Sequence, residues 1–443
     1  MAEPASGKRI LYVAWGFAPH RGPGTYRPLA TVNVLAARGH QVTVLTVGTD
    51  TFDVAVGGDH SLLAAVDPRV RLVRVDVPPT FHDPVVNRWP AGRVADPAWN
   101  RAAAAIWEQR FPDATYGIWL APLLAAARQL HGAAPFDLVI ATGNPYVDFG
   151  VALLLGQESG VPVVLDDRDS WYFNVYTGQP AHNAAGVRPW LELALDVAQE
   201  FWLVNPPLAA IHEAQFPGAE GKVQVVENGW DPRFSPVDPA APRTWGGRGP
   251  AGNGVDFSFV GTISPALPAQ LMVDAWAKAR AAEPSLAAGT LRFVGHYGYS
   301  GAVSDRQRAL AAAAQRHGVE FTGRKAKSEL MQVYANTDVL LFAKEGGHLV
   351  TSGKVYEYVA TGLPIVALIK PGHDARRVLA GYPLLFEAAE VSVPAVAEAM
   401  VRAARHQPTE AELAAARQYG AGYSREAIFT RAFDRLDRTL GWA

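Results

Sequence analysis

The chain has 443 residues, of which 49% are hydrophobic and 19% charged, a composition that predicts about two or three globular domains and excludes a disordered protein. A net charge of −2 without a dense basic run excludes a typical nucleic-acid-binding surface, so we expect no nucleic-acid partner. The lack of cysteine excludes disulfides and thiolate metal sites and suits a cytoplasmic protein. The first apolar run ends before Pro19 and is too short to span a membrane.

The N-terminal part predicts alternating strands and helices around a glycine-rich loop. The first strand, helix and strand are expected at residues 9–15, 26–38 and 41–47. In the loop after the first strand, Gly22 and Gly24 let the backbone approach a ligand. Arg27 stands where a dinucleotide-binding G-x-G-x-x-G motif has its last glycine, so that fold has little support. A ligand site and a plain turn both remain open for this loop.

Further strands follow in the first half of the chain, expected at residues 70–77, 136–141, 161–165 and 222–227. Residues 78–100 are rich in proline, tryptophan and arginine and predict an irregular excursion. Four tryptophans in and after this segment either fill the core, which we expect, or line a ligand cleft: Trp89, Trp99, Trp107 and Trp119.

An acidic loop follows the strand at 161–165. It carries Asp166, Asp167, Arg168 and Asp169 at the carboxyl end of the strand, where ligands bind in open α/β sheets. Asp167 and Asp169 have the D-x-D spacing of some metal sites, but no other carboxylate or histidine lies near them in sequence, so we expect no metal there. A solvated loop and an internal ion-pair cluster both remain open.

The composition changes at residues 235–254, which hold four prolines and five glycines and predict a surface loop near a domain boundary. A second series of strands follows, expected at residues 256–260, 291–294, 319–322, 338–343 and 364–369. The plan is therefore two β/α/β halves, each with a loop-to-helix site for an anion.

A helix between the last two of these strands predicts an anion site. Thr351 or Ser352 can cap its start, and Gly362 ends it. In a parallel strand–helix–strand unit, the helix N-terminus opens at the carboxyl edge of the sheet. Phosphate groups bind the amides and the positive dipole end at such a place. The amides in question belong to Gly353, Lys354 and Val355.

Glu357 lies about one turn inside this helix and has two interpretations. Its carboxylate can accept hydrogen bonds from two neighbouring hydroxyls, as on a ribose. Alternatively, it forms a surface ion pair with Lys354 at the i,i+3 spacing. The motif itself leaves both open.

These motifs together resemble the GT-B glycosyltransferases, and in particular family GT4, whose members are retaining transferases with nucleotide-sugar donors. The most specific match is Ser352–Val366, which is similar to the donor-binding helix of that family. Asn228–Asp231 resembles the family's Asn-Gly-aromatic-Asp turn at the interdomain hinge, and residues 24–27 and 162–171 resemble the subgroup that builds bacterial surface polysaccharides. The resemblance extends from about residue 8 to residue 430.

The resemblance implies an α/β protein of two Rossmann-like domains with a deep interdomain cleft and a C-terminal helix that crosses back to the N-domain. The implied domains are an acceptor-side domain of residues 1–215 with helix 412–443 and a nucleotide-sugar-binding domain of residues 216–411. The implied reaction moves a sugar from a nucleoside-diphosphate sugar to a hydroxyl of a glycan, a lipid-linked sugar or a small molecule. No metal or other cofactor is expected. The expected location is the cytoplasm or, for a lipid-linked acceptor, the inner face of the membrane with peripheral contact.

Carried over position by position, the resemblance implies three groups of site residues. The implied catalytic residues are Arg168, Asp169 and Glu345. The implied donor-binding residues are Gly22, Gly24, Gly261, Thr262, Arg324, Ser352, Gly353, Lys354, Val355 and Glu357. The implied acceptor-side residues are Asn144 and Asp167.

The chain departs from the family pattern at two places. Residues 260–267 lack the arginine and lysine that neutralise the diphosphate in many members. The remaining candidates for that role are Lys354, Arg324, Lys325 and backbone amides. Leu349 stands where the family often has an acid, and Glu345 replaces that acid only if the intervening loop folds back. A nucleotide-sugar 2-epimerase and a nucleotide-binding protein without transferase activity therefore remain alternatives.

Overall fold

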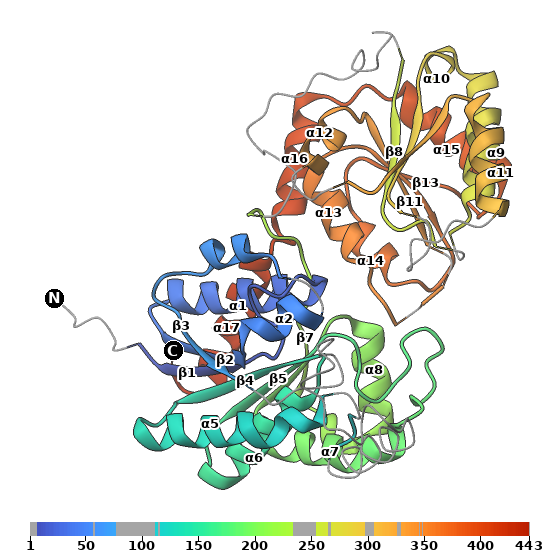
Figure 1. Cartoon of the computed structure of the whole chain (residues 1–443). Coiled ribbons are helices and arrows are strands. Elements are labelled where there is room, and N and C mark those ends of the chain that lie inside the picture. Colours follow the sequence, from blue (N-terminus) through green and yellow to red (C-terminus); the bar gives the residue numbers. More distant parts are fainter. Residues whose placement is uncertain are drawn as a thin grey trace, which may run out of the picture. The chain divides into compact units, whose positions relative to one another are not determined.

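The computed structural model of the chain divides into two units, residues 1–228 with 428–443 and residues 229–427 (Figure 1). The structure describes residues 7–55, 58–76, 111–113, 116–233, 254–264, 267–296, 305–325, 329–344, 346–347 and 349–442. Of the four tryptophans noted above, Trp119 is buried in the core, as expected, and the other three lie outside the described residues.

The first unit is built on a seven-stranded parallel sheet in the order β3-β2-β1-β4-β5-β6-β7. Its strands are β1 (Arg9–Val13), β2 (Gln41–Val47), β3 (Arg71–Val75), β4 (Leu138–Gly143), β5 (Val163–Asp167), β6 (Glu200–Leu203) and β7 (Val223–Val225). The central strands are buried on both faces, which is why they are nearly continuous runs of Val, Ile and Leu. The strand order reverses between β1 and β4, and ligands of open α/β sheets bind at such a switch point.

Helices cover both faces of this sheet. They are α1 (Tyr26–Ala37), α2 (Thr49–Ala55), α5 (Leu120–Ala133), α6 (Val147–Ser159), α7 (Ala184–Val197), α8 (Pro206–Gln215) and α17 (Arg425–Thr439). Figure 1 shows α1 and α17 on one face and α5, α6 and α7 on the other. The described residues contain no helix with the length and apolar character needed to cross a bilayer.

The C-terminal helix α17 is anchored to the first unit. Arg435 donates to Glu200 at the start of β6 (2.8 Å), and Arg38 at the end of α1 pairs with Asp434 (2.8 Å). Phe433 is buried with its ring centroid 5.7 Å from that of Trp202 on β6. The predicted return of the C-terminal helix to the N-terminal unit is confirmed.

The second unit is built on a six-stranded parallel sheet in the order β10-β9-β8-β11-β12-β13. Its strands are β8 (Phe257–Val260), β9 (Leu291–Val294), β10 (Val319–Gly323), β11 (Val339–Lys344), β12 (Ile365–Ile369) and β13 (Leu385–Glu387). Its helices are α9 (Ala269–Ala282), α10 (Pro284–Ala287), α11 (Asp305–Gln315), α12 (Leu330–Ala335), α13 (Gly353–Thr361), α14 (Ala375–Leu379), α15 (Val393–Arg405) and α16 (Glu410–Ala421). The predicted fold class, two Rossmann-like parallel-sheet domains, is confirmed.

Strand β11 divides two hydrophobic cores. Leu341 and Ala343 face the core that includes Trp276 of α9, whereas Leu340 and Phe342 face the core that includes α13. Side chains alternate between the faces of a strand, so the next residue, Lys344, lies on the α13 face.

The unit boundaries differ from the predicted domain boundaries at residues 215 and 411. β7 pairs with β6 of the first sheet, which carries the first unit on to residue 228. Leu413 and Ala416 of α16 belong to the α13 core, which carries the second unit on to residue 427. Both elements are assigned by long-range packing and pairing, which no local pattern in the sequence reports.

Candidate functional site

Helix α13 begins at the carboxyl edge of the second sheet, between the neighbouring strands β11 and β12. Ser352 precedes it with an extended backbone (φ −60°, ψ 126°), and its hydroxyl makes no hydrogen bond to the helix. The Val355 amide donates to the Ser352 carbonyl (3.0 Å), so of the three amides predicted to face a ligand, that of Val355 is already used. The amides of Gly353 and Lys354 precede the helical bonding pattern and have no helical acceptor.

The helix start faces open space and has a rigid base. A Cβ built on Gly353 would meet no atom within 4 Å. The Thr351 hydroxyl, predicted as a possible helix cap, instead bonds the carboxylate of Asp374 (2.5 Å), which also pairs with Arg377 (2.9 Å). Thr351 is therefore committed to holding the loop, and the room at Gly353 lies beside the exposed amides.

Glu357 and Lys354 form the i,i+3 ion pair that was one of the two interpretations. The ammonium lies 2.5 Å from the Glu357 carboxylate, and both side chains remain partly exposed. The charge of Lys354 is therefore compensated within the helix, so Lys354 is a weaker candidate for neutralising an anion than its position in the sequence indicates.

Lys344 was missed by the sequence reasoning. It ends β11 on the face shared with α13, and its neighbour across the sheet is Ile369. Burial lowers the pKa of its ammonium, and within the described residues that ammonium has no hydrogen-bond or ion-pair partner. The signal in the sequence is a single lysine that ends the wholly apolar run 339–343 just before the helix. As far as the described residues show, it is a cation without a partner at the edge where α13 begins.

The other residues of this unit that were predicted to bind the sugar donor lie along the same edge, at different distances from the start of α13. Gly261 and Thr262 follow β8, the strand beside β11, and the Tyr358 hydroxyl of α13 bonds the amide (2.7 Å) and carbonyl (3.3 Å) of Val260 there. Arg324 follows β10, three strands from β11, which is roughly 14 Å at the usual strand spacing. Gly261 and Thr262 are thus brought to α13, and Arg324 is not. Glu345 lies outside the described residues.

Arg168 of the first unit ties together the loops at the strand ends. Its guanidinium donates to the carbonyls of Gly143 (2.6 Å) at the end of β4, Asn144 (2.8 Å) directly after it, and Gly24 (3.1 Å) in the loop after β1. A Cβ on Gly24 would lie only 2.8 Å from this guanidinium, so any other residue here would make the arginine side chain shift. The structure brings Gly24, Asn144 and Arg168 together. In the described chain these acceptors are neutral, so the arginine charge is not cancelled by them.

The acidic loop contains one buried ion pair and one buried carboxyl group. Asp166 pairs with Arg27 of α1 (2.7 Å), and both side chains are buried. The ion pair is therefore not the predicted cluster around Arg168: Asp166 pairs with an arginine of another element, and in the described residues Arg168 bonds backbone carbonyls. Asp169, in contrast, is exposed. Arg27, which replaces the last glycine of the dinucleotide motif, also donates to the carbonyl of Val226 (2.9 Å), so it fixes the chain after β7.

The side chain of Asp167 is not positioned to contact an acceptor substrate. It is fully buried, accepts hydrogen bonds from the Trp171 amide (2.9 Å) and the Tyr146 hydroxyl (3.2 Å), and has a pKa raised by burial to about 7. A carboxyl group without exposed surface holds the loop in place, so the acceptor-side role expected for it is not supported.

His20 is a second residue that the sequence reasoning missed. Its Nδ1 lies 2.8 Å from the Thr25 hydroxyl, and burial together with the nearby charge of Arg168 lowers its pKa. A Cβ on Gly22 would lie 2.5 Å from its ring, so this glycine makes room for the imidazole. A neutral imidazole therefore lies in the same loop cluster as Arg168. Its position two residues before Gly22 was the available signal.

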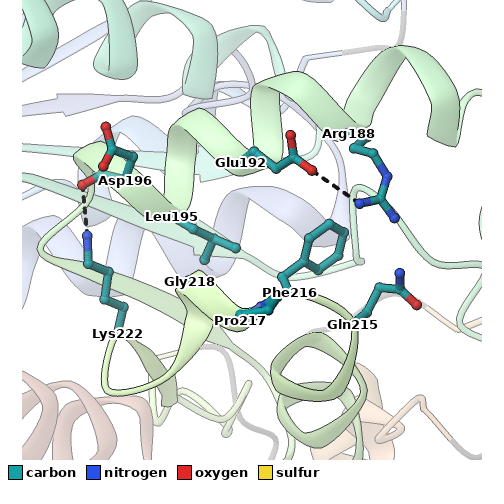
Figure 2. Close-up of a pocket in the computed structure, with 9 residues that line it drawn as sticks. All are labelled: Arg188, Glu192, Leu195, Asp196, Gln215, Phe216, Pro217, Gly218 and Lys222. Atoms are coloured by element: carbon teal, nitrogen blue, oxygen red, sulfur yellow. Dashed lines mark hydrogen bonds and ion pairs between the residues drawn. The ribbon is translucent and has the colours of Figure 1, made fainter.

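A pocket of about 430 Å³ lies elsewhere on the first unit, beside α7 (Figure 2). Figure 2 shows Arg188 in an ion pair with Glu192 (3.1 Å) and the Lys222 ammonium bonded to the backbone carbonyl of Asp196 (2.8 Å). It lies toward the amino ends of β6 and β7, whereas ligands of such sheets bind at the carboxyl ends. Among the described residues, no three His, Asp or Glu side chains converge as metal ligands.

Comparison with known proteins agrees with this geometry. Residues 254–406 match the family described as group 1 glycosyl transferases. No curated protein sequence matches the chain. Its structure is similar to sucrose-phosphate synthase of Thermosynechococcus elongatus (15% identity, 98% of this chain and 100% of that chain covered, TM-score 0.59). It is also similar to Anabaena HepE in complex with UDP (15%, 97% and 100%, 0.61) and to the catalytic domain of Arabidopsis thaliana starch synthase IV bound to ADP and acarbose (13%, 98% and 100%, 0.60).

At these identities the structural similarity shows the fold, and the family match concerns the unit that carries α13. The predicted resemblance to the GT-B glycosyltransferases is confirmed at that level. The chain has the GT-B fold, and its residues 254–406 match the family of group 1 glycosyl transferases, which supports a glycosyltransferase enzyme.

Proposed function

We propose that the enzyme transfers a sugar, with retention of anomeric configuration, from a nucleoside-diphosphate sugar to a hydroxyl acceptor. The observation that carries this proposal is the start of α13. There, two amides without helical acceptors, Glu357 and a lysine that has no partner among the described residues share one sheet edge. All lie within the domain matched by the family. The UDP in HepE and the ADP in starch synthase IV support a nucleoside-diphosphate donor.

The diphosphate would bind where the field is positive. The amides of Gly353 and Lys354 and the helix dipole favour an anion, and Lys344 adds a full charge at partial burial, where its attraction is stronger than in water. These groups would stabilise the negative charge that develops on the leaving diphosphate during transfer. Because they supply this positive charge, the proposal includes no metal or other cofactor.

Glu357 would bind the ribose of the donor. Its carboxylate is partly exposed, and ribose hydroxyls can compete with the ammonium of Lys354 for it because an exposed ion pair is worth only about 0–1 kcal/mol. Displaced from Glu357, Lys354 would be available to the diphosphate. This arrangement favours ribonucleotides over deoxyribonucleotides.

The loop cluster of the first unit would serve the acceptor and the transferred sugar. It offers the charge of Arg168, the neutral imidazole of His20 and the exposed side chains of Asn144 and Asp169. The acceptor is a glycan, a lipid-linked sugar or a small molecule with a free hydroxyl. We place the reaction in the cytoplasm, at the inner membrane face if the acceptor is lipid-linked.

The donor half of the proposal is tested by calorimetric titration with UDP, GDP, ADP and dTDP. We expect one ribonucleotide to bind best and Glu357→Ala to weaken it about tenfold or more, because a carboxylate with two hydroxyl partners is lost. The matched control is Glu398→Ala, an exposed glutamate on α15 of the same unit, which should bind as the wild type does.

Failure of all four nucleotides to bind, or equal binding by Glu357→Ala, would contradict the donor assignment. Once the donor is known, NMR of the product gives its anomeric configuration. A product with the inverted configuration would refute the retaining part of the proposal alone.

A further inference from the structure

A second pocket, of about 470 Å³ and lined by basic residues, opens at the amino edge of the first sheet. All strands of this sheet are parallel, so this edge is opposite the one that carries the Arg168 loop cluster. The polar side chains that line it are Arg9, His40, Gln41, Thr43, Arg69 and Arg71. We propose that this pocket, the amino-edge pocket, binds a phosphate or diphosphate group, separately from the donor site.

The sheet register places the basic side chains on one face. Arg9 of β1 is the neighbour of Gln41, and Thr43, two residues further along β2, is the neighbour of Arg71 on β3. Residues two apart on a strand share a face, and so do register neighbours in parallel strands. Arg9 and Arg71 therefore flank Gln41 and Thr43 on the same side of the sheet. The long arginine side chains from β1 and β3, the two neighbours of β2, can reach an anion held between them.

Among the described residues, no carboxylate cancels the charge of two of the three arginines. Arg9 donates to the carbonyls of Ala134 (3.4 Å) and Pro135 (3.2 Å) and to the amide oxygen of Gln41 (3.3 Å), all neutral groups that fix its position. Arg71 is exposed and has no hydrogen-bond or ion-pair partner in the described part of the chain. The pocket thus holds one pre-positioned guanidinium and one unengaged guanidinium.

The remaining charged groups do not reverse this balance. Arg69 is held by Asp67 (2.7 Å), a carboxylate whose pKa this arginine lowers to about 2. Asp137 accepts a hydrogen bond from the backbone amide of Arg9 (2.8 Å). His40 accepts at Nδ1 from the Lys8 amide (3.2 Å), so its neutral form carries the proton on Nε2 as a further donor.

The chemistry of the pocket selects an oxyanion with more than one charge. Arginine forks match the oxygen geometry of phosphate, and a threonine hydroxyl and an imidazole N–H are additional donors. No carboxylate is among the described lining residues, so no negative charge in the lining repels an anion. The pocket of Figure 2 differs in this respect, because its Arg188 and Lys222 are already bonded and Glu192 and Asp196 also line it.

The test uses the full-length protein with inorganic pyrophosphate, titrated at low and at moderate salt. We expect Arg71→Gln to weaken one pyrophosphate-binding component about tenfold or more and Arg71→Lys to restore part of it, since lysine keeps the charge and loses the fork. The control is Arg128→Gln, an exposed arginine of the same unit that is paired with Glu158, and it should bind pyrophosphate as the wild type does. Binding of the donor nucleotide should be unchanged in Arg71→Gln.

The source of the phosphate is read from a parallel vesicle experiment. Flotation with phosphatidylcholine vesicles, with and without phosphatidic acid, is compared for wild type and Arg71→Gln. Arg71-dependent flotation identifies a lipid headgroup, and Arg71-dependent pyrophosphate binding without flotation identifies a soluble phosphorylated ligand. Equal pyrophosphate binding and equal flotation of wild type and Arg71→Gln would overturn the proposal, whatever the outcome at the donor site.

Discussion

Lys344 places a charge where burial makes it costly. Burial destabilises the ammonium relative to water and so lowers its pKa, and in the described part of the chain no partner offsets this cost. A hydrophobic residue would fit the end of β11 at lower cost. The cost is explained if the ammonium gains an anionic partner when the donor binds, a trade of stability for function that is common at active sites.

We therefore expect Lys344→Met, which keeps the apolar stem and removes the charge, to have opposite effects on binding and stability. Affinity for the preferred nucleoside diphosphate should fall about tenfold, with little change for the corresponding nucleoside, because only the diphosphate contact is lost. The melting temperature should stay the same or rise. Calorimetric titration and thermal unfolding measure both, and an equal loss for nucleoside and nucleoside diphosphate would show that the residue acts only structurally.

Asp167 predicts a pH dependence of stability. Its pKa is near 4 when unfolded and is raised to about 7 by burial in the fold, so the folded state binds the extra proton between these values. The contribution to stability is therefore full below the unfolded pKa and is lost as pH rises through the folded pKa, by about 3 kcal/mol between pH 5 and pH 8. Asp167→Asn should lack this contribution.

Urea unfolding of the two proteins at pH 5 and pH 8 checks this expectation. Asparagine keeps an acceptor for the Trp171 amide or the Tyr146 hydroxyl and cannot ionise. The free energy of unfolding of Asp167→Asn should therefore rise relative to that of the wild type as pH rises. An equal difference in stability between the two proteins at pH 5 and at pH 8 would show that the carboxyl group is already ionised in the fold at pH 5 and would contradict the raised pKa.

Helix α13 was predictable from its sequence to a large extent. Apolar strands before and after it, and Gly362 in the left-handed conformation at its end, gave its place and its limits. The partners of its side chains were not predictable. Nothing local in the sequence reports that Thr351 bonds Asp374 or that Tyr358 holds the end of β8, because these contacts join residues far apart in the chain.

The first amide of α13 can be removed without disturbing the helix. Gly353 is its first residue, where proline is well tolerated, and the extended backbone of Ser352 suits a residue before proline. Gly353→Pro should therefore fold normally and bind the nucleoside diphosphate more weakly, by about fivefold to tenfold for one lost charge-assisted hydrogen bond. Gly353→Ala keeps the amide and adds its Cβ in open space, so it is the control. Equal titration curves for the two variants would exclude this amide from the site.

At the scale of the whole molecule, the two-unit α/β plan followed from the alternation of strands and helices on either side of the glycine- and proline-rich stretch. The unit boundaries did not, because β7 and α16 are assigned by packing across the chain. In the candidate site, the order along the sequence identified α13 and the acidic loop. It could not show that Arg168 donates its hydrogen bonds to backbone carbonyls. Nor could it show that the Lys344 ammonium has no ion-pair partner among the described residues.

The anchoring of α17 to the first unit predicts selective destabilisation. Phe433→Ala removes a buried ring against Trp202 and should cost about 3–5 kcal/mol. Only the first unit contains these residues, so calorimetry should show the transition of that unit at lower temperature, with the other transition and the affinity for the nucleotide retained. A loss of nucleotide affinity in the folded variant would contradict the claim that nucleotide binding is independent of the packing of α17 on the first unit.

The central claim is that the start of α13 binds the diphosphate of the donor and Glu357 its ribose. The most direct measurement is a crystal structure of the enzyme with its preferred nucleoside diphosphate. We predict phosphate oxygens within hydrogen-bond distance of the Gly353 amide and the Lys344 ammonium, and both ribose hydroxyls on the Glu357 carboxylate. A nucleotide bound elsewhere, or one whose ribose leaves Glu357 paired only with Lys354, would contradict the account.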